Sequence, residues 1–363
     1  MRIFILADAN SIHTKRWVLS LAKQKVDIFL FSFCKNYDNY YSSLLNVHVY
    51  GCLDKSNNSI SGKIKYLFYL FTLRRRIKEF NPDILHAHYA SSYGLLGALT
   101  GFHPYVISVW GSDVYDFPQK NMFAKQMLEY NLKKADYILS TSHVMAKETK
   151  KYTNKKIMIT PFGVDTNAFK GQERAGIDPI FIIGNVKTLS PKYGIDILIR
   201  AYKIIVEKNS KMHTGLVIIG DGPCRKEYEY LAEKLGLQDL IQFRGKVPNN
   251  KLPEYYNNFS VFVSTSVSNS ESFGVVAVEA MACECPVITS DADGFTEVVE
   301  DGQTGFIVPK KDVEATAKAI QKFIDEPELR AIMGKKGRER VLALYDWNDN
   351  VRTMLEIYNE ILR

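Results

Sequence analysis

Short apolar runs alternate with longer amphipathic stretches throughout the first half of the chain. Such runs, rich in Ile, Val, Phe and Tyr, are typical of buried strands, and the stretches between them have helical periodicity. Strands are expected near residues 2–7, 27–33, 46–50, 83–88, 105–110, 137–141 and 156–160. This alternation predicts a parallel, doubly wound α/β sheet, in which ligands bind beyond the carboxyl ends of the strands.

The second half repeats the pattern and is organised around Glu271–Glu279. Strand-like runs at 261–265 and 286–289 flank this stretch, so residues 275–283 are expected to form a short buried helix. Ser270 or Ser272 is predicted to cap it. Helices are also expected near 311–325, 327–344 and 347–362.

Composition and charge indicate that the chain consists of two parts. A length of 363 residues with 46% apolar content predicts two domains. Residues 1–170 contain 23 Lys and Arg against 12 Asp and Glu, whereas residues 171–363 contain 24 against 28. A basic first half and a mildly acidic second half indicate that the two halves meet different partners.

The densest basic run lies in residues 63–80, which combine several aromatic side chains with Arg74, Arg75 and Arg76. This composition is typical of a helix on an anionic membrane surface. A helix packed on the core with its arginines in water fits the pattern equally well. Nucleic acid is not expected as a partner, because no recognised binding motif accompanies the charge.

No segment of the sequence is expected to span a membrane. The longest stretch without charged residues, 86–112, is interrupted by glycines and Pro104. The five scattered cysteines indicate a reducing compartment, and the chain begins directly with a strand. A cytoplasmic protein is therefore expected, with peripheral attachment to the inner face of the membrane if residues 63–80 bind lipid.

The Glu271–Glu279 stretch has the composition of a phosphate-binding helix start. Gly274 permits close approach of a ligand to the backbone, and the amide groups that begin a helix suit a diphosphate. Glu279, inside the helix, is placed to bind a ribose diol, and Glu271, in the preceding loop, to meet sugar hydroxyls. A capped core helix with one solvated and one buried glutamate is the alternative.

The same stretch, continuing through Ile288, resembles the donor-site signature of the GT-B glycosyltransferases of group 1 (family 4). The resemblance implies two Rossmann-like domains that face each other across a cleft and a nucleotide-sugar donor. It further implies that Glu271 approaches the transferred sugar and that Glu279 binds the ribose. The residues implied to receive the sugar and phosphates are Ser272, Phe273, Gly274 and Val275.

Two further donor-binding elements are implied by the resemblance. The family commonly has an Arg and a Lys that grip the diphosphate after the first strand of the second domain, and Lys187 and Lys192 stand at that spacing. Lysine keeps the charge but lacks the bidentate fork of arginine. The backbone of Lys246 and Val247 is implied to pair with the nucleobase.

In the first domain, the loop after the first strand holds candidate acceptor-binding residues. In related enzymes this loop is rich in glycine, whereas no glycine is present here, so side-chain contacts are expected instead. The candidates are Asn10, His13, Lys15 and Arg16. The alternative is a helix cap with solvated charges.

Two later strand ends supply candidate catalytic residues. We expect His86 and His88 to point to opposite faces of the sheet, which disfavours a metal pair and leaves His88 as the candidate for substrate contact. The family often has a histidine at the position of Trp110. Because Trp110 cannot accept a proton, the polar role of the family's histidine is expected to pass to Asp113, His13 or His88. Asp113 could instead cap the following segment.

A metal site and a cofactor are not expected. Asp291 and Asp293 match the Asp-x-Asp metal motif of a different glycosyltransferase fold, but they lie where a surface loop is expected. Residues 159–169 resemble the family's crossing between domains, and residues 170–178 are expected to form the hinge. The resemblance implies domains at 1–168 and 169–346, with 347–363 returning to the first.

The predicted function is transfer of a sugar from a nucleotide-sugar, with UDP as the expected nucleotide, to a glycan or glycolipid hydroxyl. Retention of configuration is implied only by the family. Two alternatives remain: a sugar-nucleotide epimerase on the same architecture, and a binding homologue without activity. An epimerase requires an acid–base pair facing the sugar, and Trp110 together with the glycine-free loop favours the binding homologue.

Overall fold

The structure is a computed structural model that describes residues 1–34, 40–53, 60–172 and 180–363, with only the backbone described for residues 53 and 60–68. The chain divides into two compact units. Unit 1 comprises Met1–Pro161 with Asp349–Arg363, and unit 2 comprises Phe162–Asn348. Most of the expected hinge, residues 170–178, lies outside the described residues.

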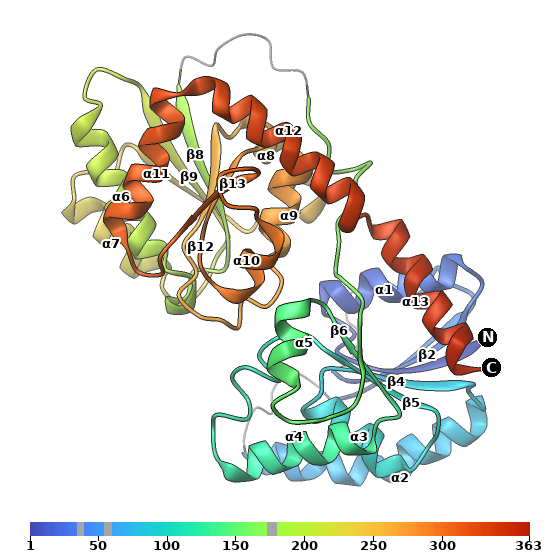
Figure 1. Cartoon of the computed structure of the whole chain (residues 1–363). Coiled ribbons are helices and arrows are strands. Elements are labelled where there is room, and N and C mark those ends of the chain that lie inside the picture. Colours follow the sequence, from blue (N-terminus) through green and yellow to red (C-terminus); the bar gives the residue numbers. More distant parts are fainter. Residues whose placement is uncertain (35–39, 54–59, 173–179) are drawn as a thin grey trace. The chain divides into compact units, whose positions relative to one another are not determined.

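Unit 1 is built on a seven-stranded parallel sheet with the order β3-β2-β1-β4-β5-β6-β7 (Figure 1). Its strands are β1 (Arg2–Leu6), β2 (Asp27–Cys34), β3 (Val47–Leu53), β4 (Ile84–His88), β5 (Tyr105–Val109), β6 (Tyr137–Ser140) and β7 (Ile157–Ile159). All seven lie where the apolar runs predicted them. The strand order reverses between β1 and β4, so the loops after these two strands lie side by side.

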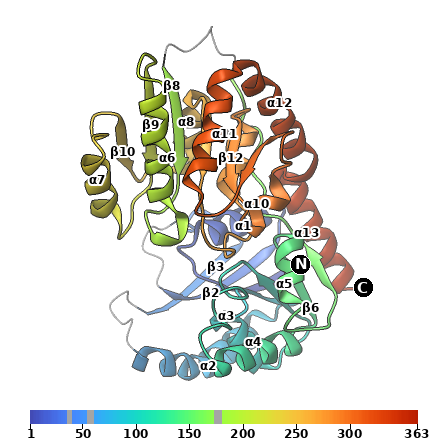
Figure 2. The same cartoon turned by 60° about the vertical axis from the view of Figure 1, so that its left-hand side comes forward.

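Helices cover both faces of this sheet. They are α1 (Ile12–Lys23), α2 (Ile60–Phe80), α3 (Ser92–Thr100), α4 (Met122–Lys134), α5 (His143–Thr149) and α13 (Trp347–Ile361). α2, α3 and α4 form one layer, with α3 between the other two (Figures 1 and 2). These helices cover a hydrophobic core that includes the strand residues Phe4, Leu6, Leu85 and Ile107.

Unit 2 contains a six-stranded parallel sheet with the order β10-β9-β8-β11-β12-β13. Its strands are β8 (Phe181–Val186), β9 (Thr214–Ile219), β10 (Ile241–Gly245), β11 (Val261–Ser264), β12 (Val287–Ser290) and β13 (Gly305–Val308). Its helices are η1 (Pro191–Tyr193), α6 (Ile195–Lys208), α7 (Arg225–Lys234), η2 (Asn249–Lys251), α8 (Leu252–Asn258), α9 (Val275–Ala282), α10 (Asp293–Val298), α11 (Val313–Asp325) and α12 (Pro327–Leu344). The two parallel sheets confirm the predicted α/β fold.

The order of the second sheet reverses between β8 and β11, which pair directly. The loop after β8 therefore lies beside the loop after β11. The first contains Lys187, Lys192 and Gly194, and the second contains Glu271 and Gly274. Gly194 has a φ of +60°, and a Cβ there would come within 2.2 Å of the Thr265 carbonyl oxygen, so only glycine allows this approach of the two loops.

Arg338 on α12 connects several backbone segments of unit 2. Its guanidinium donates to the carbonyl oxygens of Thr166 at 3.2 Å and Phe169 at 3.0 Å, near the start of the unit. It also donates to the carbonyl oxygen of Ala282, the last residue of α9. The end of α9 is thus joined to the segment through which the chain enters unit 2.

Candidate active site

A buried ion pair lies at the adjoining strand ends of unit 2. Lys187 Nζ is 2.5 Å from Glu271 Oε2, and the two side chains are only 11% and 10% exposed. The Ser266 hydroxyl donates to the same carboxylate oxygen at 3.2 Å. The ion pair joins a candidate phosphate-binding lysine to the glutamate expected to meet the sugar, and the sequence did not predict this contact.

Tyr193 joins the second candidate lysine to this group. The ammonium nitrogens of Lys187 and Lys192 lie 4.8 Å and 4.9 Å from the centre of the Tyr193 ring. Both distances are within the range of cation–π attraction. The sequence predicted no role for Tyr193, yet its ring lies near both ammonium groups.

Helix α9 follows the loop that contains Glu271, and the predicted cap of this helix is wrong. Neither Ser270 nor Ser272 occupies the cap position, which belongs to Gly274 in a left-handed conformation with a φ of +80°. A Cβ at Gly274 would come within 2.6 Å of the Phe295 ring. The backbone therefore turns into the helix through glycine. The amides of Ala277 and Val278 donate to the Gly274 carbonyl oxygen at 2.9 Å and 3.3 Å, which leaves the amides of Val275 and Val276 without a partner inside the helix.

Glu279 is held in place by two side chains from the segment after β10. Its carboxylate accepts hydrogen bonds from Asn249 Nδ2 at 3.1 Å and from the Tyr256 hydroxyl at 3.0 Å. Burial, together with the Glu279 charge, raises the pKa of Tyr256 well above its usual range, so this hydroxyl remains a donor. Lys246 and Val247 immediately precede this segment, which places the expected nucleobase and ribose residues near each other.

A turn that contains Gly220 and Gly222 follows β9 at the same edge of the sheet. The Gly220 amide donates to the Gly245 carbonyl oxygen at 2.8 Å, which joins the ends of β9 and β10. Gly220 has a φ of +133°, and a Cβ there would lie 1.9 Å from the Lys187 carbonyl oxygen. Only glycine allows the turn to pack against the loop that contains Lys187.

The Asp-x-Asp segment takes part in this packing from the other side. Asp291 pairs with Lys310 Nζ at 3.3 Å, and Asp293 begins α10. The Gly294 amide donates to the Glu271 carbonyl oxygen at 2.8 Å. Among the residues that the structure describes, no cluster of three or more His, Cys, Asp or Glu side chains could hold a metal ion.

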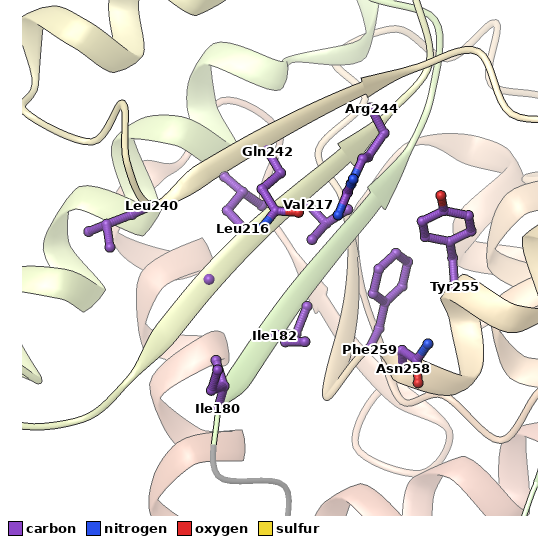
Figure 3. A pocket seen from close by; sticks show the side chains of 11 residues that line it. Ile180, Ile182, Leu216, Val217, Leu240, Gln242, Arg244, Tyr255, Asn258 and Phe259 are labelled. Carbon is purple, nitrogen blue, oxygen red and sulfur yellow. The ribbon is translucent and has the colours of Figure 1, made fainter.

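Figure 3 shows a separate pocket on unit 2, against β8, β9, β10 and α8. It has a volume of about 430 Å³, and Ile182, Val217 and Phe259 are among its lining residues. None of the predicted donor-binding residues lines it. This apolar hollow is therefore not the candidate nucleotide site.

In unit 1, the expectation for His86 and His88 is wrong. Strand side chains alternate, so residues two apart share a face, and the two imidazole ring centres lie 4.7 Å apart. The nitrogens of His86 contact the Tyr358 hydroxyl on α13 at 2.6 Å and the Ser108 hydroxyl at 2.8 Å. His86 thus has a partner at each nitrogen, whereas Nδ1 of His88 is buried without one.

Trp110 lies between the two candidate histidines of unit 1. Its ring centre is 4.7 Å from that of His88 and 5.9 Å from that of His13. Burial, and then the charge of Arg16, lowers the pKa of His13 to about 4. Burial, and then the charge of His13, lowers the pKa of His88 to about 3. Near neutral pH, both rings are uncharged and can act as hydrogen-bond acceptors.

Asp113 is buried beneath this cluster and binds backbone amides. Its carboxylate accepts hydrogen bonds from the amides of Ala90 at 2.7 Å, Trp110 at 3.1 Å and Gly111 at 2.8 Å. Burial raises its pKa despite these bonds. All three amides precede Asp113 in the chain, so these bonds are not the cap of the following segment that the sequence left open, and a catalytic role for Asp113 stays a prediction.

The four predicted acceptor residues lie on α1 and in the turn before it. His13 and Arg16 are three residues apart on α1 and share a face, which contacts Trp110 through His13. The Lys15 ammonium instead lies 5.1 Å from the centre of the Tyr40 ring. The backbone amide of Asn10 donates to Asp8 Oδ1 at 2.9 Å, within the same turn.

The buried state of His88 makes the stability of unit 1 dependent on pH. The folded pKa of about 3 lies below the unfolded value of about 6.5, so the unfolded chain binds the proton first as pH falls. The contribution of His88 to stability is thus present above about pH 6.5 and lost below it, by about 1.4 kcal/mol per pH unit. His88→Asn should reduce the difference in unfolding free energy between about pH 7 and about pH 5 by about 2 kcal/mol in urea titrations.

The exposed His48 on β3 supplies the control for this measurement. His48→Asn makes the same substitution at an exposed position and should leave the pH dependence unchanged. Equal pH dependence in His88→Asn and the unsubstituted chain would contradict the prediction.

Two parallel, doubly wound units, one of which gathers two lysines and a helix start at its topological switch point, define an α/β enzyme of the GT-B architecture. Family models agree: "Glycosyl transferases group 1" matches residues 169–340, and "Glycosyl transferase 4-like" matches residues 2–142. The chain belongs to the group 1 glycosyltransferases and is an enzyme of this class.

Individual proteins show the same relationship. An uncharacterized glycosyltransferase of Methanocaldococcus jannaschii is 28% identical over 304 residues, which cover 82% of this chain and 81% of that protein. The capsular polysaccharide biosynthesis glycosyltransferase CapM of Staphylococcus aureus is 31% identical over 212 residues, 57% of this chain and 53% of CapM. HepE of Anabaena, solved with UDP, has a TM-score of 0.83 at 19% identity and covers 99% of this chain and 100% of its own, which shows the shared fold.

Proposed function

We propose that the protein transfers a sugar from a UDP-sugar to a hydroxyl of a lipid-linked or polysaccharide intermediate of cell-surface glycan synthesis. The observation that carries the proposal is the group formed by Lys187, Lys192, Tyr193 and Glu271 beside the start of α9. HepE supports UDP as the nucleotide because its structure was solved with UDP. CapM supports the acceptor class because its name places it in capsular polysaccharide synthesis.

The ion pair suggests how a donor would be recognised. A diphosphate can replace the Glu271 carboxylate as the anion beside Lys187, while Lys192 and the amides that begin α9 take the remaining charge. Glu271 is then released toward the hydroxyls of the sugar. Glu279, already oriented by Asn249 and Tyr256, accepts hydrogen bonds from the ribose.

In this proposal the chemistry needs neither a metal nor a cofactor. Two ammonium groups and the helix start neutralise the departing UDP, and the leaving phosphate accepts the proton of the attacking hydroxyl. The glycosidic bond to the phosphate oxygen breaks as the bond to the acceptor oxygen forms on the same face, so configuration is retained. His88 and His13, both neutral, are the proposed contacts for the acceptor in unit 1.

Titration calorimetry tests both the proposed preference for UDP and the proposed independence of its binding from metal ions. UDP should bind more tightly than GDP or ADP, and EDTA should leave its affinity unchanged. Release of UDP from UDP-sugars, with and without added glycan acceptors, then separates an enzyme from a binding homologue. UDP binding that appears only with magnesium would overturn the proposed neutralisation by lysines.

Tyr193 gives this proposal a sharper test. Tyr193→Leu removes the ring beside both ammonium groups and should weaken UDP binding about tenfold, whereas Tyr193→Phe should retain it, because the attraction comes from the ring face. Calorimetry with uridine supplies the control, since a ligand without phosphates should bind both variants equally. An equal loss for uridine and UDP would show that Tyr193 only supports the fold.

Residues 63–80 supply the proposed attachment to the inner face of the membrane, on the cytoplasmic side. The side chains of residues 63–68 lie outside the described part of the chain. Among the described residues, no helix is long and apolar enough to cross a membrane. In a flotation assay with anionic liposomes, neutralising Arg74, Arg75 and Arg76 should reduce the bound fraction, and unchanged binding would remove this element of the proposal.

A further inference from the structure

The outer side of the α2–α3–α4 layer exposes large apolar side chains at both of its flanking helices. On α4, Met122 is 67% exposed and Phe123 is 74% exposed, in the first turn of the helix. On α2, Phe71 is 78% exposed. Adjacent exposed apolar residues of this size are a cost in water, so they indicate a surface that meets an apolar partner.

Basic side chains lie further along the same face of α4. Lys133 and Lys134 are exposed at the end of α4, and the Lys134 ammonium lies 5.8 Å from the centre of the Tyr130 ring. By helical spacing, Met122, Phe123, Tyr130 and the two lysines share the outward face of α4. The buried side of α4 includes Ala124, Leu128, Asn131 and Leu132.

The described part of α2 has the same arrangement. Arg74, Arg75 and Lys78 are exposed and lie around Phe71 by helical spacing. Glu79, the acidic residue of this turn, pairs with Arg75 at 2.8 Å and with Arg76 at 2.9 Å. The Arg74 guanidinium donates to the carbonyl oxygen of Leu99 on α3 at 2.7 Å, which ties α2 to its neighbour.

Helix α3, between the two basic helices, contains no charged residue. Its partly exposed positions include Leu95 and Leu99. The layer thus has basic and aromatic positions on its two flanking helices and an uncharged helix in the middle. The three helices lie along one face of the sheet in both Figure 1 and Figure 2.

We propose that the outer face of α2, α3 and α4 binds an anionic lipid surface, with Met122 and Phe123 entering the boundary between headgroups and acyl chains. The side chains on this face match the two demands of such a surface, because lysine and arginine attract anionic headgroups and Phe and Met partition into the boundary. The inference rests on the proposed lipid-linked acceptor. It extends the proposed membrane attachment from α2 to a surface of three helices.

Vesicle co-sedimentation of the full chain tests the surface. The protein should sediment with vesicles of mixed phosphatidylcholine and phosphatidylglycerol, much less with pure phosphatidylcholine, and less as salt is added. The double variant Met122→Ser/Phe123→Ser should weaken binding about tenfold or more through lost apolar burial. Lys133→Glu/Lys134→Glu should weaken it by a similar factor, since each basic residue near the surface contributes about fivefold.

Matched control variants lie on unit 2. Tyr230 on α7 is 65% exposed, and Lys335 and Lys336 are adjacent exposed lysines on α12. Tyr230→Ser and Lys335→Glu/Lys336→Glu should bind the mixed vesicles as the unsubstituted chain does. Equal losses in the α4 and control variants would overturn the assignment, as would equal binding to neutral and anionic vesicles.

The UDP affinity of each variant separates this inference from the proposed function. The α4 variants should lose vesicle binding and keep their UDP affinity, because the substituted residues lie on unit 1. A chain that binds vesicles but not UDP would refute the proposed donor and leave the surface intact. A chain that binds heparin and UDP but no vesicle would refute the lipid surface in favour of a soluble polyanion.

Discussion

Replacing Lys187 with alanine is expected to lower kcat/KM for the donor by about 10²- to 10³-fold. Lys187 is a largely buried cation whose partner Glu271 lies in the loop before α9, and loss of one preorganised charge beside a leaving group has effects of this size. Lys187→Arg should recover part of the activity because the charge remains. Steady-state release of UDP at several donor concentrations measures the effect.

The ion pair with Glu271 allows stability to be separated from catalysis. Lys187→Ala leaves a carboxylate that is 10% exposed without its partner, and breaking a buried pair in this way costs about 3–5 kcal/mol. Lys187→Ala/Glu271→Gln should recover the unfolding free energy and remain inactive. Recovery of activity in the double variant would show that Lys187 serves only to neutralise Glu271.

Glu279→Gln is expected to weaken UDP binding about 10- to 100-fold. Hydrogen bonds to a charged group contribute about 1.5–3 kcal/mol each, and the carboxylate is proposed to accept from the ribose. Glutamine fills the same volume, but its single amide oxygen can accept from only one of Asn249 and Tyr256, so the unfolding free energy of the variant is measured alongside its affinity. Titration calorimetry with UDP measures the change.

A ligand without ribose hydroxyls completes the experiment on Glu279. The unsubstituted protein should prefer UDP to 2′,3′-dideoxy-UDP, whereas Glu279→Gln should bind both with similar affinity. The four affinities form a cycle that isolates the interaction between the carboxylate and the diol. A preference for UDP that persists in Glu279→Gln would place the ribose elsewhere.

The fold could be predicted from the sequence because each strand is a short apolar run between amphipathic stretches. β1 and β4, at 2–6 and 84–88, lie within the expected ranges, and α9 begins at Val275 as expected. These elements depend on local patterns. The cap of α9 was predicted wrongly, because preference for serine at a cap does not show that the backbone would turn through Gly274.

The site was predictable as a set of residues but not as a set of contacts. Lys187 and Glu271 are far apart in the chain and meet because β8 pairs with β11. The order of the strands in the sheet cannot be predicted from a local sequence pattern. No role was predicted for Tyr193 for the same reason, because its contacts depend on the positions of the two lysine ammonium groups in the folded chain.

The error at His86 and His88 has a different origin. The period of a strand is two, so the spacing itself predicts a shared face, and the sequence contained the information needed. The apolar residues of α4 were missed for a third reason. Met122 and Phe123 lie in a short mixed segment, and only the structure shows that they point away from the core.

The guanidinium of Arg338 gives α9 a mechanical role in addition to its electrostatic one. The helix starts at the proposed phosphate position and ends at Ala282, whose carbonyl oxygen shares Arg338 with Thr166 and Phe169. A small displacement of α9 along its axis would therefore pull on the strand of chain that enters unit 2. If a nucleotide binds at the proposed position, we expect its binding to be coupled to the geometry of that entry segment through Arg338.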